Sequence, residues 1–408
     1  MESKRERARP ISPPAAAASM AATLAVLGDD NLLGEILLRL AFPTNLVRAA
    51  AVCRRWCRVA SDPAFLRRFR DLHHPPRLLG FYLSLFTPGW RIEFVPVLPQ
   101  PPELAAVVRR ARFGLDNYDS PSTRIMNCRN GAVVVSLVRD GFSVQGVHSP
   151  LHPGRAMVAF PPPPRVPRED DEISIFCEIV SEEDGDGRLS FFWFSLGYSN
   201  KEDKAIANVH MLQDGAWVMR ASATTQVPSL QVSKLKTLSF FLSDDKIYMS
   251  IFMHNILVLD LRSSTFSTIN FPVHIAFDGE MVVSGANGSG VYLVHVDELK
   301  LHISLHREGN GSIGDWSVVN TISLQEMCAN LRMSNGMSED GDAPDVYIHE
   351  VGHNAEFVFL EMYGCVIYLD VRSRAMQKVY TVAEKGARVC WIHPFKMIWP
   401  PAFPALQD

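Results

Sequence analysis

The stretch Leu27-Gly-Asp-Asp-Asn-Leu-Leu-Gly-Glu-Ile-Leu-Leu-Arg-Leu40 determines how the N-terminal part of this 408-residue chain folds. Its apolar side chains recur at the spacing of one face of an α-helix, at Leu32, Leu33, Ile36, Leu37 and Leu40. Asp29 and Asp30 precede this face, where a carboxylate can accept hydrogen bonds from the first free N–H groups of a helix. The stretch therefore predicts a short amphipathic helix.

Two more helices are expected downstream. Pro43-Thr44 interrupts the chain, and Thr44 is a suitable N-cap for a second helix. The apolar face of that helix is formed by Leu46, Ala49, Cys53, Trp56 and Ala60, and its outer side carries Arg48, Arg54, Arg55 and Arg58. Asp62 is expected to cap a third helix, with Pro63 at the first helical position. Three helices in about 45 residues cannot bury so many large apolar side chains among themselves, so a partner or the following domain should cover part of them.

The chain from about residue 78 onward predicts a β architecture, because short apolar runs alternate with Gly, Asn, Asp and Pro. Lys246–Ser263 aligns without a gap on Glu356–Ser373, and Val291–Asn320 supplies another unit between them. Units of roughly 45–55 residues are typical of propeller blades of about four strands, so this region would hold about six or seven. Leu78–Leu98 and Trp391–Pro401 are expected to complete the closing blade. A β-sandwich or jelly roll is the alternative.

The helical stretch resembles the F-box. The matching elements are the leucine-rich segment 27–40, Val52-Cys-Arg-Arg-Trp56 and Asp62-Pro-Ala-Phe65. Gly28 stands where the family usually has proline. The β region resembles the F-box-associated β-propellers of large plant F-box families, through Asn130-Gly131, His148-Ser-Pro-Leu151, Phe160-Pro161 and His393-Pro394. The expected fold is multidomain α and β: a disordered tail (1–23), a small three-helix F-box (24–75) and an all-β propeller-like domain (76–408).

The resemblance implies a function. In this family the F-box docks on a Skp-type adaptor, which links it to a cullin–RING ligase. The chain would then be the substrate receptor of an SCF-type (Skp–cullin–F-box) ubiquitin ligase, recruiting a protein substrate and itself no enzyme. The adaptor contacts implied by the match are Leu27, Leu32, Leu33, Ile36, Leu37, Pro43, Leu46, Val52, Cys53 and Trp56. The arginines on the outer side of the second helix would then attract the F-box toward an acidic adaptor. The alternative is a propeller interaction protein whose helices are only a structural cap.

The substrate surface is expected on one face of the propeller, where loops project. The candidate loops are Glu182–Gly187, Asn200–Lys204, Glu308–Gly314 and Ser334–Asp342.

Composition agrees with an intracellular protein of the nucleus or cytoplasm. Seven scattered cysteines without a Cys-x-x-Cys pair indicate reduced thiols and no zinc site. Residues 75–408 contain 28 Lys or Arg and 37 Asp or Glu, which argues against nucleic acid as the main ligand. The chain has no run of 18 apolar residues, so no membrane span is expected.

One motif suggests an enzyme. His349-Glu-Val-Gly-His353 fits the H-E-x-x-H pattern of zinc metalloproteases, which requires both histidines on one face of a helix. Gly352 inside the motif and the alternating sequence on both sides favour a strand–turn–strand instead. The sequence therefore predicts no catalytic residue, metal or cofactor, and a metalloprotease is a remote alternative.

Overall fold

The computed structural model describes residues 28–40, 42–73, 78–87, 89–115, 123–139, 142–164, 172–183, 188–199, 202–226, 239–250, 255–272, 281–288, 290–307, 316–334, 345–384, 386–399, 401 and 403. The chain forms two compact units. The helical unit comprises the residues up to Arg77 and those from Ile398 onward, and the β unit comprises Leu78–Asp184 and Arg188–Met397. The sequence-based boundaries assigned the last residues to the β domain, whereas the side chain of Trp399 packs with the helices. The tail 1–23 lies outside the described residues.

Four helices form the described part of the helical unit between residues 28 and 73: α2 (Asp30–Leu37), α3 (Pro43–Ala50), α4 (Arg54–Ala60) and α5 (Pro63–Leu72). Asp29 caps α2 by accepting hydrogen bonds from the backbone N–H groups of Asn31 (2.8 Å) and Leu32 (3.2 Å). Asp62 caps α5 by accepting from the N–H of Phe65 at 2.9 Å. These two helix starts therefore follow the N-cap signals in the sequence.

The predicted second helix is two helices, so that prediction was wrong. Pro43 is the first residue of α3 and Phe42 is its N-cap residue, so Thr44 lies inside the first turn and does not cap it. The chain then becomes extended at Cys53, where φ is −161° and ψ is 165°, before α4 begins. The break reorients the chain, so that Ala60 of α4 shares one core with Leu46 of α3.

The core of the helical unit includes a residue from the far end of the chain. Leu33, Leu37, Leu46, Phe69 and Trp399 are at most 2% exposed. The ring of Trp399 lies 5.4 Å from the ring of Phe69, measured between centroids. Phe403 also packs against this core. The C-terminal segment therefore supplies core residues that the first 77 residues lack.

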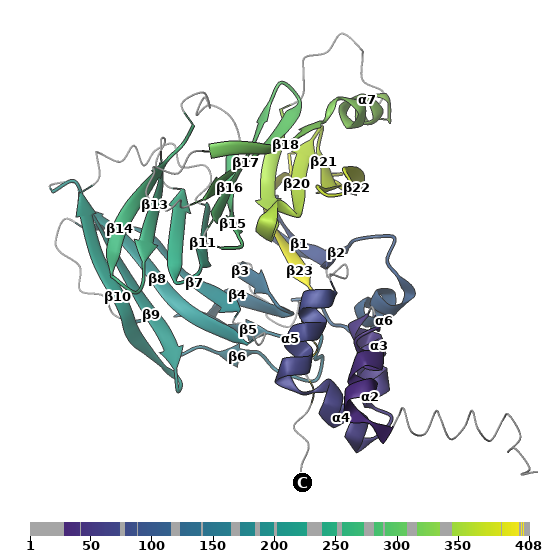
Figure 1. Cartoon of the computed structure of the whole chain (residues 1–408). Helices are drawn as coiled ribbons and strands as arrows, with labels where there is room; N and C mark the ends of the chain where they lie inside the picture. Colours follow the sequence, from purple (N-terminus) through teal and green to yellow (C-terminus); the bar gives the residue numbers. More distant parts are fainter. Residues whose placement is uncertain are drawn as a thin grey trace, which may run out of the picture. The chain divides into compact units, whose positions relative to one another are not determined.

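The described strands of the β unit form six sheets, arranged as a six-bladed propeller (Figure 1). The closing blade has three strands, in the order β2 (Trp90–Pro96), β1 (Leu78–Phe86) and β23 (Arg388–Lys396). The next two blades are β3 (Arg124–Arg129), β4 (Ala132–Arg139), β5 (Phe142–His148) and β6 (Val158–Ala159), then β7 (Glu172–Glu183), β8 (Leu189–Ser199), β9 (Lys204–Gln213) and β10 (Ala216–Gln226).

The remaining three blades each have four antiparallel strands. They are β11 (Ser239–Ser243), β12 (Lys246–Ser250), β13 (Asn255–Asp260) and β14 (Thr265–Asn270); β15 (Met281–Ala286), β16 (Gly290–Asp297), β17 (Lys300–Arg307) and β18 (Trp316–Ser323); and β19 (Tyr347–Val351), β20 (Phe357–Met362), β21 (Cys365–Asp370) and β22 (Ala375–Thr381). Two further helices, α6 (Pro102–Arg110) and α7 (Gln325–Ser334), and a short 3₁₀ helix, η3 (His353–Ala355), complete the described elements.

The innermost strands form a closed ring, because β3, β7, β11, β15, β19 and β23 each contact the next, and β23 contacts β3. The ring closes where β23, from the end of the chain, pairs with β1, which confirms the predicted closing blade (Figure 1). Closure pairs strands that would otherwise be exposed edges. The architecture is therefore a propeller, and the sandwich alternative was wrong.

The predicted repeat is confirmed as equivalent strand pairs of two blades, β12–β13 and β20–β21. Each pair ends in the same turn. Asp260 accepts a hydrogen bond from the N–H of Ser263 at 2.9 Å, and Asp370 accepts one from the N–H of Ser373 at 2.7 Å. The shared Leu-Asp-x-Arg-Ser sequence is therefore the turn that leads to the outermost strand of the blade.

Gly80 sits in the middle strand of the closing blade, where only glycine fits. A Cβ there would lie 2.4 Å from Cζ of Phe94 and 2.5 Å from the carbonyl oxygen of Val95. Because the backbone oxygen cannot move aside, Gly80→Ala should lower the free energy of unfolding by about 1–3 kcal/mol. Urea denaturation of the full chain measures this. Gly154→Ala is the control, since a Cβ there meets no atom within 4 Å. Equal midpoints for both variants would contradict the prediction.

Within the described ranges, no helix has the length and apolar character needed to cross a membrane.

Candidate functional site

Of the ten residues predicted to contact the adaptor, some are exposed on the surface of the helical unit and others are buried in its core. Leu32, Ile36 and Val52 are 45%, 38% and 65% exposed, and Cys53 is also exposed. Leu33, Leu37, Pro43 and Leu46 are buried, and Trp56 is half-buried against the same core. Leu27 lies outside the described residues. The structure therefore separates side chains that a partner could touch from those that hold the helices together.

The exposed apolar residues lie on two helices and one turn. Leu32 and Ile36 are one helical turn apart on α2, so they share a face. Val52 follows α3, and Val47, in α3 itself, is 43% exposed. Val47 was missed because the predicted apolar stripe of the second helix ran through its neighbour Leu46. Large apolar side chains left in water on such a small unit are typical of an interaction surface.

Ion pairs hold the helices that carry this surface. Arg55 contacts Asp30 at 2.7 Å and Arg58 contacts the same carboxylate at 3.3 Å, which joins α4 to α2. The hydrogen bond from Arg55, together with the positive charges of Arg55 and Arg58, lowers the pKa of Asp30. Arg68 of α5 contacts Glu35 of α2 at 2.5 Å. Two of the arginines expected to face an acidic partner are thus engaged within the unit, while Arg48 and Arg54 are exposed.

The two histidines of the H-E-x-x-H motif do not share a helix face. His349 lies in strand β19, where Nε2 is 2.8 Å from Oε2 of Glu361. His353 begins the 3₁₀ helix η3, and its Nε2 is 2.9 Å from Oδ1 of Asn287. Among the described residues, no group of three or more His, Cys, Asp or Glu is arranged to hold a metal ion. The helix that a zinc protease requires is replaced here by a strand and a turn.

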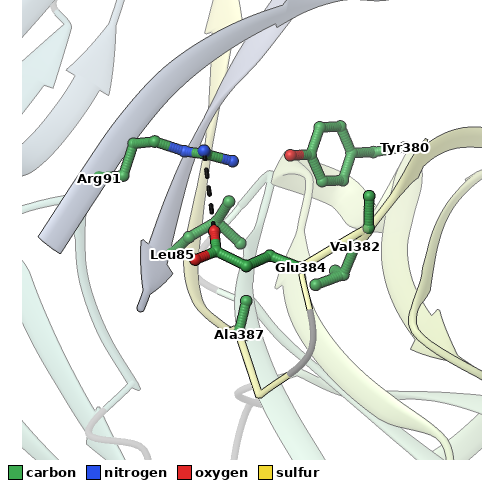
Figure 2. A pocket seen from close by; sticks show the side chains of 7 residues that line it. Leu85, Arg91, Tyr380, Val382, Glu384 and Ala387 are labelled. Carbon is green, nitrogen blue, oxygen red and sulfur yellow. Dashed lines mark ion pairs between the residues drawn. The ribbon is translucent and has the colours of Figure 1, made fainter. Parts of the chain in front are cut away.

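The loops proposed as the substrate surface lie largely outside the described residues. A small pocket with a volume of about 250 Å³ lies beside the closing blade. It is lined by Leu85, Arg91, Tyr380, Val382, Ala383, Glu384 and Ala387. Figure 2 shows Arg91 and Glu384 pointing toward each other, 3.9 Å apart. The pocket is smaller than most small-molecule sites, and its two charges balance, so it does not indicate a catalytic centre.

Two inner strands hold acidic side chains with raised pKa values. Loss of hydration among the surrounding strands raises the pKa of Glu178 in β7 and of Glu350 in β19 to about 8 each. The N–H of Val351 and the charge of Lys396 oppose this shift at Glu350. Between pH 4.5, the ordinary pKa of a glutamate, and about pH 8, Glu178 and Glu350 are therefore protonated in the folded protein and ionised in the unfolded chain.

This shift predicts a pH dependence of stability. Because unfolding releases protons from these two carboxyl groups between the two pKa values, their contribution to the free energy of unfolding should fall as pH rises from about 5 to about 8. The double variant Glu178→Gln with Glu350→Gln should lose less stability over that interval. Urea denaturation of both proteins at each pH measures the difference. Identical slopes would show that these carboxyl groups titrate normally.

Comparison with known proteins agrees with this architecture. The family model described as "F-box protein AT5G49610-like, beta-propeller" matches residues 124–403, and the one described as "F-box-like" matches residues 30–72. No curated protein matches the chain.

Similar solved structures include prolyl oligopeptidase B from Galerina marginata, with 12% identity, a TM-score of 0.34, and coverage of 85% of this chain and 56% of that chain. The chain therefore spans little more than half the length of that enzyme. The α-L-arabinanase of Penicillium chrysogenum has 8% identity and a TM-score of 0.31, over 80% of this chain and 87% of that chain. Since the propeller match covers more than half of the sequence, this chain belongs to the family of F-box proteins with an AT5G49610-like β-propeller.

Proposed function

We propose that this protein is the substrate receptor of an SCF-type ubiquitin ligase. The observation that supports the proposal best is the set of exposed apolar side chains on the F-box helices, Leu32, Ile36, Val47 and Val52. These side chains remain in water although the unit already has its own core of buried residues. A Skp-type adaptor would cover them and link the chain to a cullin–RING ligase.

The propeller would hold the protein substrate, and the chain itself would do no chemistry. Its contribution to rate would be proximity, because a lysine of the bound substrate and the charged ubiquitin carrier would meet within one complex. The seven cysteines are all free, which suits a reducing nuclear or cytoplasmic compartment. The proposal includes no nucleic acid or membrane partner.

Reconstitution tests the proposal. The purified full chain is mixed with a Skp-type adaptor and then with a cullin–RING core, and the assembly is followed by size-exclusion chromatography. We expect a stoichiometric complex in which the chain's own lysines receive ubiquitin when the remaining ligase components are added. A chain that elutes alone, with folded helices, would favour the rival role of the helical unit as a structural cap.

A further inference from the structure

Three exposed aromatic side chains form one cluster at an end of the closing blade. Phe86, Trp90 and Trp391 are 50%, 37% and 46% exposed. The ring centroids of Trp90 and Trp391 are 5.4 Å apart with the planes nearly parallel, at 18°. The ring of Phe86 meets that of Trp90 edge to face, also at 5.4 Å. The residues come from three different strands, so the cluster is fixed by the propeller closure itself.

The strand register adds a positive charge to this cluster. Phe86 in β1 is paired with Trp90 in β2 on one side and with Arg388 in β23 on the other. Directly paired residues of adjacent antiparallel strands share a face, so the row runs Trp90, Phe86, Arg388. Arg124 begins β3, the inner strand next to β23. Both arginines are exposed, and neither forms an ion pair with any other described residue.

This composition is that of a binding hot spot. Tryptophan and arginine are the residue types over-represented among side chains that dominate protein–protein affinity. Aromatic rings offer a large contact area that is already ordered by mutual stacking, so little side-chain entropy is lost on binding. The pocket on the opposite side of the β1–β2 hairpin differs, because Arg91 there is balanced by Glu384.

We propose that the aromatic surface, defined as Phe86, Trp90, Trp391 and Arg388, binds an acidic segment of the protein substrate that presents an apolar side chain. The apolar side chain packs against the exposed rings, and the neighbouring carboxylates pair with Arg388 and Arg124. Charge complementarity selects this partner. Arg388 lies on the same row as the rings, where no acidic side chain is paired with it, and Arg124 begins the neighbouring inner strand; neither arginine forms an ion pair with another described residue. The inference rests on the proposed role of the propeller as the substrate holder.

Synthetic peptides test this surface on the full chain. The probes are fluorescein-labelled 12-residue peptides with a central Phe, Leu or Trp flanked by Asp and Glu. Matched peptides carry Lys in place of the acids or Ala at the centre. Fluorescence anisotropy should show the acidic apolar peptides binding at least about tenfold more tightly than either control. Trp391→Ala should weaken that binding about tenfold or more, and Arg388→Glu should shift the preference toward the Lys peptides. Met219→Ala, which changes an exposed apolar side chain of β10, should leave it unchanged.

Several results would overturn the inference. One is equal binding of the acidic and basic peptides, or no binding of either. Another is binding that survives Trp391→Ala and Arg388→Glu. A dimer of the full chain that Trp391→Ala converts to a monomer, seen by analytical ultracentrifugation, would assign the surface to self-association. Adaptor binding is measured on the same variants and should not change. If the wild-type chain fails to bind the adaptor, the proposed function is wrong. The peptide assay would still show whether the aromatic surface binds acidic segments.

Discussion

Replacing Trp399 by alanine is expected to unfold the F-box helices while the propeller remains folded. Trp399 is 2% exposed, and its ring lies against the ring of Phe69, tilted by 36°, in the core of the helical unit. Truncating a buried tryptophan costs about 3–5 kcal/mol. A helical unit of about 45 residues, stabilised by about 0.05–0.15 kcal/mol per residue, has about 2–7 kcal/mol in total, so the loss is comparable to the whole stability of the unit. Hydrogen exchange of residues 30–72, measured in the full chain, should accelerate toward the unfolded rate.

Two further variants make this result specific. Trp391→Ala removes a tryptophan that is 46% exposed and lies only eight residues earlier, so exchange in residues 30–72 should not change. Trp399→Phe keeps an aromatic ring and should restore most of the protection. Near-ultraviolet circular dichroism should show intact propeller packing in all three. Slow exchange of α2 and α5 in Trp399→Ala would contradict the assignment of the C-terminal segment to the F-box core.

The second large effect concerns the exposed side of the same helices. Ile36→Asp combined with Val52→Asp should weaken adaptor binding at least about 100-fold, because a desolvated charge would face the partner's apolar surface. The helices should stay folded, since both side chains point into water. Isothermal titration with a purified Skp-type adaptor measures the affinity.

The control for this experiment is Leu72→Asp. Leu72 is an exposed leucine of α5 outside the predicted contact set, and its substitution should leave the affinity unchanged. Leu37→Asp is unsuitable as a binding test, because Leu37 is 1% exposed and its loss would unfold the unit. Wild-type affinity in the Ile36→Asp, Val52→Asp variant would place the adaptor elsewhere.

Local signals made much of the fold predictable. Asp29 and Asp62 cap helices where the sequence places them, because an N-cap depends on residues two or three positions away. The repeat of Lys246–Ser263 in Glu356–Ser373 was informative because equivalent blade strands face the same packing. The two halves of the closing blade were recognisable as strands, although their pairing is between opposite ends of the chain.

Other features depended on context that no local pattern contains. Strand β3 has no regular apolar alternation in the sequence, because a bulge between Ile125 and Asn127 interrupts it. Outer strands such as β14 and β22 consist mostly of exposed or half-buried residues, so their apolar periodicity is weak. The sequence could not show that Leu32 is exposed and Leu33 is buried, since both belong to one wide apolar stripe of the helix. Which of the two is buried depends on the residues that pack against the helix. The core around Leu33 includes Trp399, which is distant in sequence.

Hydrogen exchange of the full chain with and without a saturating Skp-type adaptor tests the central claim most directly. The claim predicts that exchange slows in α2 and in the turn around Val52, the segments that carry the exposed apolar side chains, and stays the same in the inner strands of the propeller. No change in residues 28–73, or slowing confined to the β unit, would contradict it.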